Sequence, residues 1–154
     1  MAHSSKLYDY LVSLGATVSL LEENERQKLD RQWLRVFCRQ VKKQTGKWIH
    51  DGYRWHAYSF EFEKAKQGDA AMKCYKSLRP KKFLVFTDWG PEIGFMCEGI
   101  QPPDLTVLRN DYFVFPKSFL WTMCFTHEQP TFGPYFACTD WRAFEDKKKA
   151  WEEG

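Results

Sequence analysis

The chain of 154 residues has helical periodicity in its first half and short apolar runs in its second half. In the first half, large apolar side chains recur at every fourth residue, which is the spacing of an apolar helix face. They are Leu29, Trp33, Phe37 and Val41. This segregation predicts an α+β fold, in which residues 1–154 form one domain. We expect a mostly antiparallel sheet of about five to six strands packed against two or three helices.

Helices are expected where apolar spacing coincides with end signals. The clearest one is expected to start at an N-cap, Asn24, and to run to about Gln44, with Gly46 ending it. Three further helices are expected at Ser5–Leu14, at Lys66–Leu78 and from Trp141 to about Trp151.

Strands are expected where apolar residues alternate with polar ones or form short runs between turn residues. The run His56–Glu63 alternates in this way, as a half-buried strand does. A turn at Trp89–Pro91 is expected to join Lys82–Thr87 to Glu92–Glu98 in a hairpin. The other expected strands are Ala16–Leu21, Asp111–Phe115, Phe119–Phe125 and Tyr135–Cys138, with a short helical turn around Leu105–Leu108.

The charge of the chain is nearly balanced, with 23 Lys and Arg against 20 Asp and Glu and a formal net charge of +3. Nucleic-acid-binding domains concentrate basic residues on one face, whereas the basic clusters here are short, so nucleic acid is not the expected partner. Four basic side chains recur at every fourth residue of the long expected helix and would form one basic face. A nucleic-acid-binding protein that uses this face is therefore the third hypothesis. The four side chains are Arg31, Arg35, Arg39 and Lys43.

The sequence lacks the features that mark secretion, membrane insertion and cofactor binding. Met1–Lys6 lacks the apolar region of a signal peptide, and no apolar run is long enough for a membrane span, so we expect a cytoplasmic protein. The five cysteines are widely spaced without a C-x-x-C pair, which indicates reduced, mostly buried thiols. No spacing matches a metal-binding, nucleotide-binding or G-x-S-x-G motif, and no cofactor or metal is expected.

His127 and Glu128, with Cys124 nearby in the sequence, form the most enzyme-like group of the chain. A thiol nucleophile needs a base within hydrogen-bond reach, and His127 would be that base. Cys124 falls within an expected apolar strand, where buried thiols are common, and His127–Glu128 is better explained as a pair that pins its loop. A small hydrolase or transferase that uses His127 with Glu128 or Cys124 is therefore the alternative hypothesis, and a non-catalytic binding protein is the first.

Two stretches carry a resemblance to a known family. The first is Arg54-Trp55-His56-x-x-Ser59-Phe60. The second and more specific one is Asp111-x-Phe113-x-Phe115-x-x-x-Phe119-x-Trp121-Thr122, which continues to Thr126-His127-Glu128 and Gly133-Pro134-Tyr135-Phe136. From about Trp33 to Phe136 the chain resembles the DUF4275 family of small bacterial proteins, which has no assigned enzymatic activity.

Proteins of this size and type often act as immunity proteins beside the toxins of polymorphic or contact-dependent inhibition systems. The resemblance implies a monomer or homodimer that binds a cognate toxin domain and occludes its active site. Inhibitors that bind cationic nuclease toxins are frequently strongly acidic, whereas this chain has a net charge of +3. A nuclease bound through a broadly acidic surface is therefore not the expected toxin. Aromatic residues make up 18% of the chain, enough to leave some rings at the surface as binding anchors beside loop acids. The candidate partner-binding residues are Asp51, Tyr53, Trp55, Asp88, Trp89, Glu92, Asp104, His127 and Glu128.

Overall fold

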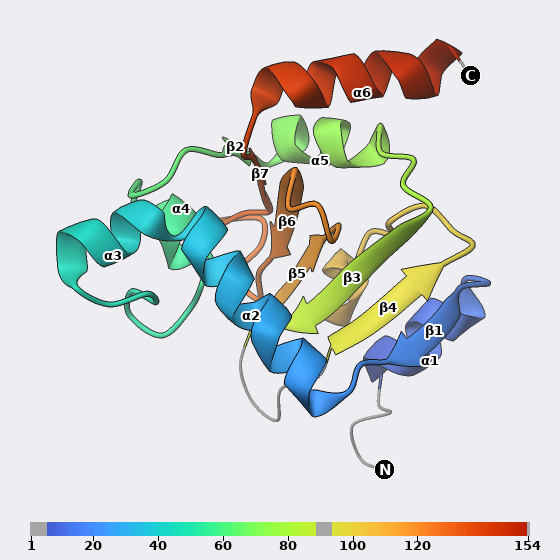
Figure 1. Ribbon diagram of the computed structural model, residues 1–154, viewed down its shortest axis with the longest axis horizontal. Helices are drawn as coiled ribbons and strands as arrows, with labels where there is room; N and C mark the ends of the chain where they lie inside the picture. The colour runs from blue at the N-terminus through green and yellow to red at the C-terminus, as the bar shows by residue number, and fades with distance from the viewer. Residues whose placement is uncertain (1–5, 89–93, 154) are drawn as a thin grey trace.

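The computed structural model describes residues 6–88 and 94–153, and within them the chain forms one antiparallel sheet in the order β1-β4-β3-β5-β6-β7-β2 (Figure 1). Each neighbouring pair of strands is antiparallel. The strands are β1 (Thr17–Leu20), β2 (Lys66–Gln67), β3 (Lys82–Thr87), β4 (Gly94–Glu98), β5 (Tyr112–Phe115), β6 (Trp121–Phe125) and β7 (Tyr135–Cys138).

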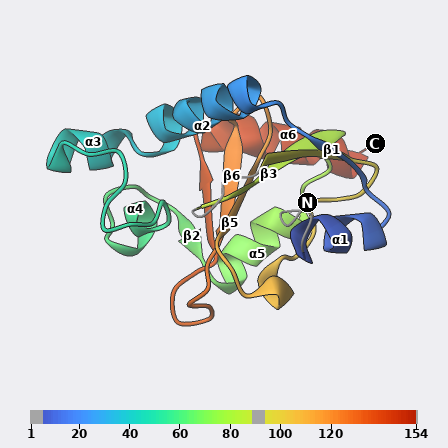
Figure 2. The ribbon, with the colours of Figure 1, turned by 90° about the horizontal axis from the view of Figure 1, so that it is seen from below.

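The helices cover both faces of this sheet (Figure 2). Helices α2 and α3 lie on one face and helices α1 and α5 on the other, while α6 runs along one end of the strands (Figures 1 and 2). The helices are α1 (Lys6–Ser13), α2 (Glu23–Phe37), α3 (Arg39–Thr45), α4 (His56–Ser59), α5 (Asp69–Lys76), the 3-10 turn η2 (Thr106–Leu108) and α6 (Trp141–Glu153).

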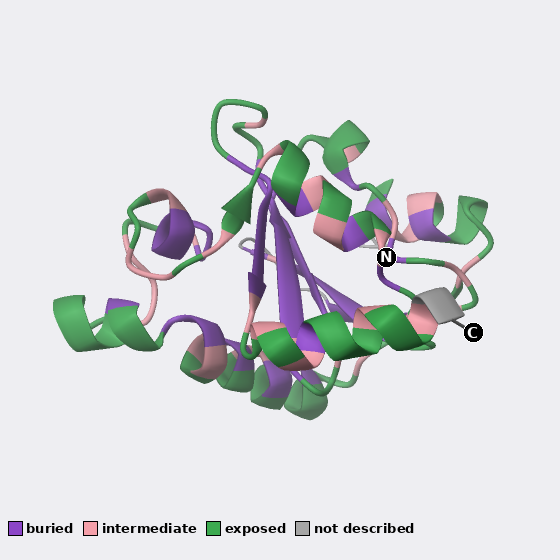
Figure 3. Ribbon diagram, turned by 90° about the horizontal axis from the view of Figure 1, so that it is seen from above, coloured by how far each residue is buried: buried purple, intermediate pink, exposed green. Residues whose placement is uncertain are grey.

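Two apolar clusters lie on opposite faces of the sheet. One joins Leu7 and Leu11 of α1, Tyr75 of α5 and Phe144 of α6 to alternate residues of the strands. The other joins the apolar face of α2 to the intervening strand residues. Consequently every residue of β5 and β6 is buried, and Figure 3 shows the buried strands between helices whose outer sides are exposed. Burial on both faces explains why these strands are continuous apolar runs in the sequence.

The predicted α+β class is confirmed, although seven strands replace the five or six expected and the helices exceed the two or three expected. Each strand expected in the second half is found, and so is the pairing of β3 with β4. The turn expected at Trp89–Pro91 lies outside the described residues. In the part of the chain that is described, no helix is both long and apolar enough to cross a membrane.

The strand predicted at His56–Glu63 is wrong, because this segment forms α4 followed by turns. Three consecutive side chains from His56 are buried, whereas a strand would bury every second one. Glu61 has a φ of 61°, which is incompatible with an extended strand. In the sheet, the strand that pairs with the outer edge of β7 is β2. An eight-residue alternation is too short to exclude a compact turn held by tertiary contacts.

The helix predicted from Asn24 to Gln44 is interrupted at Cys38, whose φ of −120° and ψ of 29° are not helical. The N-cap lies at Glu22, two residues before the expected one, and Gly46 ends α3 in the left-handed conformation as predicted. The Glu63 carboxylate accepts the Gln40 backbone N–H at 2.6 Å. This contact satisfies a backbone donor that the interruption leaves free, so a residue distant in sequence stabilises the break.

Candidate functional site

Two buried carboxylates lie side by side at one end of the sheet. Asp88 directly follows β3 and Asp111 directly precedes β5, and because these strands are antiparallel their ends meet. The Asp88 backbone N–H donates to the Asp111 carbonyl at 3.0 Å. Both residues are less than 10% exposed, so each carboxylate needs partners inside the protein.

Arg54 is the partner of the first carboxylate. Its backbone N–H and its Nη1 both donate to Asp88, the latter at 2.9 Å from Oδ1. Its Nη2 lies 2.6 Å from Oδ1 and 2.8 Å from Oδ2 of Asp30, on α2. The guanidinium also lies 4.8 Å from the centre of the Phe113 ring. One buried cation thus ties the segment before α4 to both α2 and the end of β3.

Trp55 and His127 are the partners of the second carboxylate. The Trp55 indole N–H donates to Asp111 Oδ1 at 3.0 Å, and the His127 backbone N–H donates to the same oxygen at 2.9 Å. His127 Nδ1 lies 2.9 Å from each Asp111 oxygen. This bond leaves the other ring nitrogen, Nε2, directed away from Asp111, 3.6 Å from Glu128 Oε2. The buried carboxylate therefore fixes the orientation of a histidine that is 38% exposed.

A continuous set of ring contacts surrounds this histidine. The Tyr53 ring lies 5.2 Å from the His127 ring and is stacked at 5.6 Å on the buried Trp55. Two large apolar side chains at the rim are exposed, Phe60 at 53% and Phe132 at 41%. Phe132 lies 6.1 Å from Trp55, and Phe60 lies 4.7 Å from His50. We call this surface the aromatic–histidine patch, and its members are His50, Tyr53, Phe60, His127, Glu128 and Phe132.

The structure brings most of the predicted partner-binding residues to this region. Tyr53, His127 and Glu128 belong to the patch, and exposed Asp51 lies in the same loop. Trp55 and Asp88 are buried, so neither side chain is part of the patch surface. Trp55 stacks on Tyr53 from beneath, and Asp88 binds Arg54. Asp104 is not a member of the patch, and its carboxylate accepts the Thr106 N–H. The candidates Trp89 and Glu92 lie outside the described residues.

Sequence reasoning overlooked the two residues that organise the site, Arg54 and Asp111. Both were visible as polar members of the two resemblance stretches, each next to large aromatic residues. A charged residue flanking a buried strand or an aromatic run is a signal for a buried polar network, because it must be paired when it is drawn into the core. The exposed Phe60 and Phe132 carried no such signal.

Cys124 does not form a nucleophile–base pair with His127. Its side chain is buried in the cluster beneath α2, and burial raises its pKa well above the ordinary value. A thiol that cannot ionise is a poor nucleophile. Within the described residues no group of His, Cys, Asp and Glu side chains is arranged to hold a metal ion.

The thiols are expected to differ in their reaction with iodoacetamide, because only the thiolate reacts. Burial raises the pKa of Cys38 and of Cys97 to about 12 and raises the pKa of Cys138 further still, whereas Cys74 is half-buried and its pKa is raised without reaching that range. We expect Cys74 to be alkylated first in the folded protein at pH 8, and the other four thiols only after denaturation. Peptide mass spectrometry measures this order. Rapid native alkylation of Cys124 would contradict it.

Asp88 is expected to make stability depend on pH. Burial raises the pKa of Asp88 to about 6, against the opposing charge and hydrogen bonds of Arg54. Since the folded protein then binds this proton more tightly than the unfolded chain, its contribution is fully present below a pH of about 4 and is lost as pH rises through 6. In urea unfolding, the free energy of the wild type minus that of Asp88→Asn should decrease between pH 4 and pH 7. A difference that rises over this range would refute the assignment.

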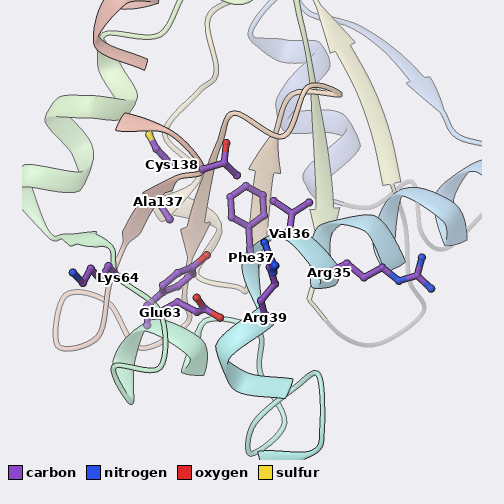
Figure 4. A pocket seen from close by; sticks show the side chains of 10 residues that line it. Arg35, Val36, Phe37, Arg39, Glu63, Lys64, Ala137 and Cys138 are labelled. Carbon is purple, nitrogen blue, oxygen red and sulfur yellow. The ribbon is translucent and has the colours of Figure 1, made fainter. Parts of the chain in front are cut away.

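A separate pocket of about 330 Å³ lies between the α2–α3 junction and β7 (Figure 4). Figure 4 shows Arg39 reaching into it beside Phe37, while Arg35 and Lys64 point away on opposite sides. Glu63 also lines it, so the charge inside is mixed. This pocket therefore has no charge selectivity that would identify a ligand.

Comparison with known protein families matches most of the chain. A family model described as a domain of unknown function, DUF4275, matches residues 20–136. Those residues include strands β2 to β6, the last residue of β1, the first two residues of β7 and all members of the aromatic–histidine patch. No curated protein and no solved structure matches the chain.

Proposed function

The chain belongs to the DUF4275 family, and from that premise we propose that it is a cytoplasmic immunity-type protein that binds a cognate toxin domain through the aromatic–histidine patch. The observation that carries the proposal is the pair of Tyr53 and His127 rings, which lie together at the surface on a buried polar framework. Such a fixed surface binds with little loss of side-chain entropy.

The composition of the patch supports a protein as the ligand. Binding hot spots are enriched in aromatic residues that lie near the centre of an interface and are surrounded by polar groups. Here Phe60 and Phe132 are exposed beside Tyr53 in the patch, and the Glu128 side chain is 43% exposed. The acids Asp51 and Glu128 would meet Lys or Arg side chains around the active site of a toxin.

The test is binding of the full chain to the product of the adjacent upstream gene, by co-purification, calorimetry and protection of growth on co-expression. Tyr53→Ala and Phe132→Ala should each weaken binding by roughly 30-fold, the effect of losing a hot-spot side chain. Leu20→Ala is the matched control, because Leu20 is 54% exposed on β1 at the other edge of the sheet. Absence of a complex and of protection, or equal binding by all three variants, rejects the proposal.

A second candidate function is a small hydrolase or transferase in which His127 acts as a general base. The observation that favours it is the Asp111–His127 pair, since a carboxylate bonded to Nδ1 fixes the tautomer that leaves Nε2 as an acceptor. With Cys124 buried, the attacking group would be a water molecule at Nε2. Glu128, 3.6 Å from Nε2, would orient that water.

The catalytic candidate predicts turnover in a panel of chromogenic carboxylic and phosphoric esters. His127→Gln should lower the rate by at least about 100-fold, the usual contribution of general-base catalysis. Leu20→Ala again serves as the control. A rate in His127→Gln close to that of the wild type would show that the activity does not come from this site.

A further inference from the structure

Two basic segments that are far apart in the sequence meet at the other end of the sheet. Arg79, Lys81 and Lys82 precede or begin β3, and Lys147 lies on α6. All four line one pocket of about 470 Å³. In Figure 1 the start of β3 lies on the side of the sheet nearest α6. Because β3 spans about 20 Å at 3.3 Å per residue, this pocket is remote from the aromatic–histidine patch beyond its end.

The charge that lines this pocket is positive. Among the residues that the structure describes, no acid lines it. Glu98 lies opposite Lys82 in the β3–β4 pair, yet the described residues show no ion pair between them. Arg79 donates from Nη1 to the Lys76 and Leu78 carbonyls at 2.8 Å, which are neutral acceptors. The guanidinium is thus held in place while its charge remains available to an anion.

The remaining walls are apolar and aromatic. Lys147 and Trp151 lie four residues apart on α6, so they share one face of the helix, above the buried ring of Trp121. Trp151 is half-buried, which leaves part of its ring accessible. Pro80, Pro116 and Leu120 complete the apolar wall, and Ser118 also lines the pocket.

We propose that this pocket binds a small phosphorylated ligand with a planar ring, of the mononucleotide class. The four cations match a phosphate group, which accepts charge-assisted hydrogen bonds from Arg and Lys. A planar ring matches the indole of Trp151, since aromatic rings stack on bases irrespective of sequence. A pocket of this volume is within the range of small-ligand sites.

Calorimetric titration of the full chain with AMP, adenosine and inorganic phosphate tests the assignment. AMP should bind saturably with a Kd below about 1 mM, and adenosine and phosphate each at least about ten-fold more weakly, because each lacks one of the two recognised groups. Lys82→Gln and Lys147→Gln should each weaken AMP binding by about ten-fold. Lys149→Gln is the matched control, since Lys149 is exposed on the same helix and is not among the residues that line the pocket. This variant should bind AMP as tightly as the wild type does.

Tryptophan fluorescence locates the bound ring. AMP should quench the wild type, and Trp151→Phe should lose that quenching while still binding AMP in the calorimeter. The proposal is overturned if AMP does not bind, if both lysine variants bind it as well as the wild type, or if phosphate binds as tightly as AMP. Circular dichroism of each variant separates these outcomes from a loss of folding.

Discussion

Replacing Arg54 with Ala is expected to destabilise the protein by about 3–5 kcal/mol, the usual cost of removing one partner from a buried ion pair. The Arg54 side chain is 3% exposed and bonds to both Asp88 and Asp30. Without it, the buried Asp88 carboxylate keeps only the backbone N–H of residue 54 as a donor from this segment. Urea unfolding monitored by circular dichroism measures the loss.

Two further variants separate the lost ion pair from lost side-chain packing. Arg31→Ala, an exposed position on α2, should change stability by less than about 0.5 kcal/mol. The double variant Arg54→Ala/Asp88→Asn should recover part of the loss, because the buried Asp88 carboxyl, which without Arg54 must either stay charged and unpaired or take up a proton, is then replaced by a neutral amide. If the double variant is less stable than Arg54→Ala, the explanation from an unpaired charge fails.

Replacing Asp111 with Ala is the second change with a large expected effect, about 3 kcal/mol of stability. The Asp111 carboxylate accepts hydrogen bonds from the Trp55 indole and from the backbone N–H of His127, and both donors would lose their acceptor. The orientation of the His127 ring would also be lost. We therefore expect both a lower midpoint of urea unfolding and weaker binding of the partner through the aromatic–histidine patch.

Glu128→Ala is the control for this prediction. Glu128 lies in the same loop and its side chain is 43% exposed, so its removal should leave stability within about 0.5 kcal/mol of the wild type. The binding effect of Asp111→Ala should be measured where the variant remains folded, below its unfolding transition. Unchanged stability in Asp111→Ala would mean that the three contacts to this carboxylate contribute nothing net.

The strands of the second half were predictable because their signal is local. Lys82–Thr87 and Tyr135–Cys138 are found with the expected bounds, and β5 and β6 differ from the expected segments only at their starts. Each is an apolar run bounded by turn residues, and burial on both faces requires such a run. The segment His56–Glu63 was misassigned because its shape depends on contacts with residues far along the chain, such as the link from Trp55 to Asp111.

The candidate site was only partly predictable for the same reason. Tyr53, His127 and Glu128 were identified by residue type and loop position, and the structure places them together. Arg54 and Asp88 are 34 residues apart and Trp55 and Asp111 are 56 apart, so no local pattern pairs them. The basic residues of the second pocket belong to short clusters that are far apart in the sequence, and no local pattern indicates that Lys82 and Lys147 line one cavity.

By itself, the sequence determined the α+β class, most of the helices and strands, and the burial of the apolar runs, since these depend on side-chain spacing along a few turns or residues. Only the tertiary structure decided that two carboxylates meet at one end of the sheet, that adjacent residues Arg54 and Trp55 each bind one of them, and that four cations meet at the other end. The physical reason is that antiparallel pairing brings together the ends of strands that are distant in the chain. Charges drawn into such a junction must then find partners across it.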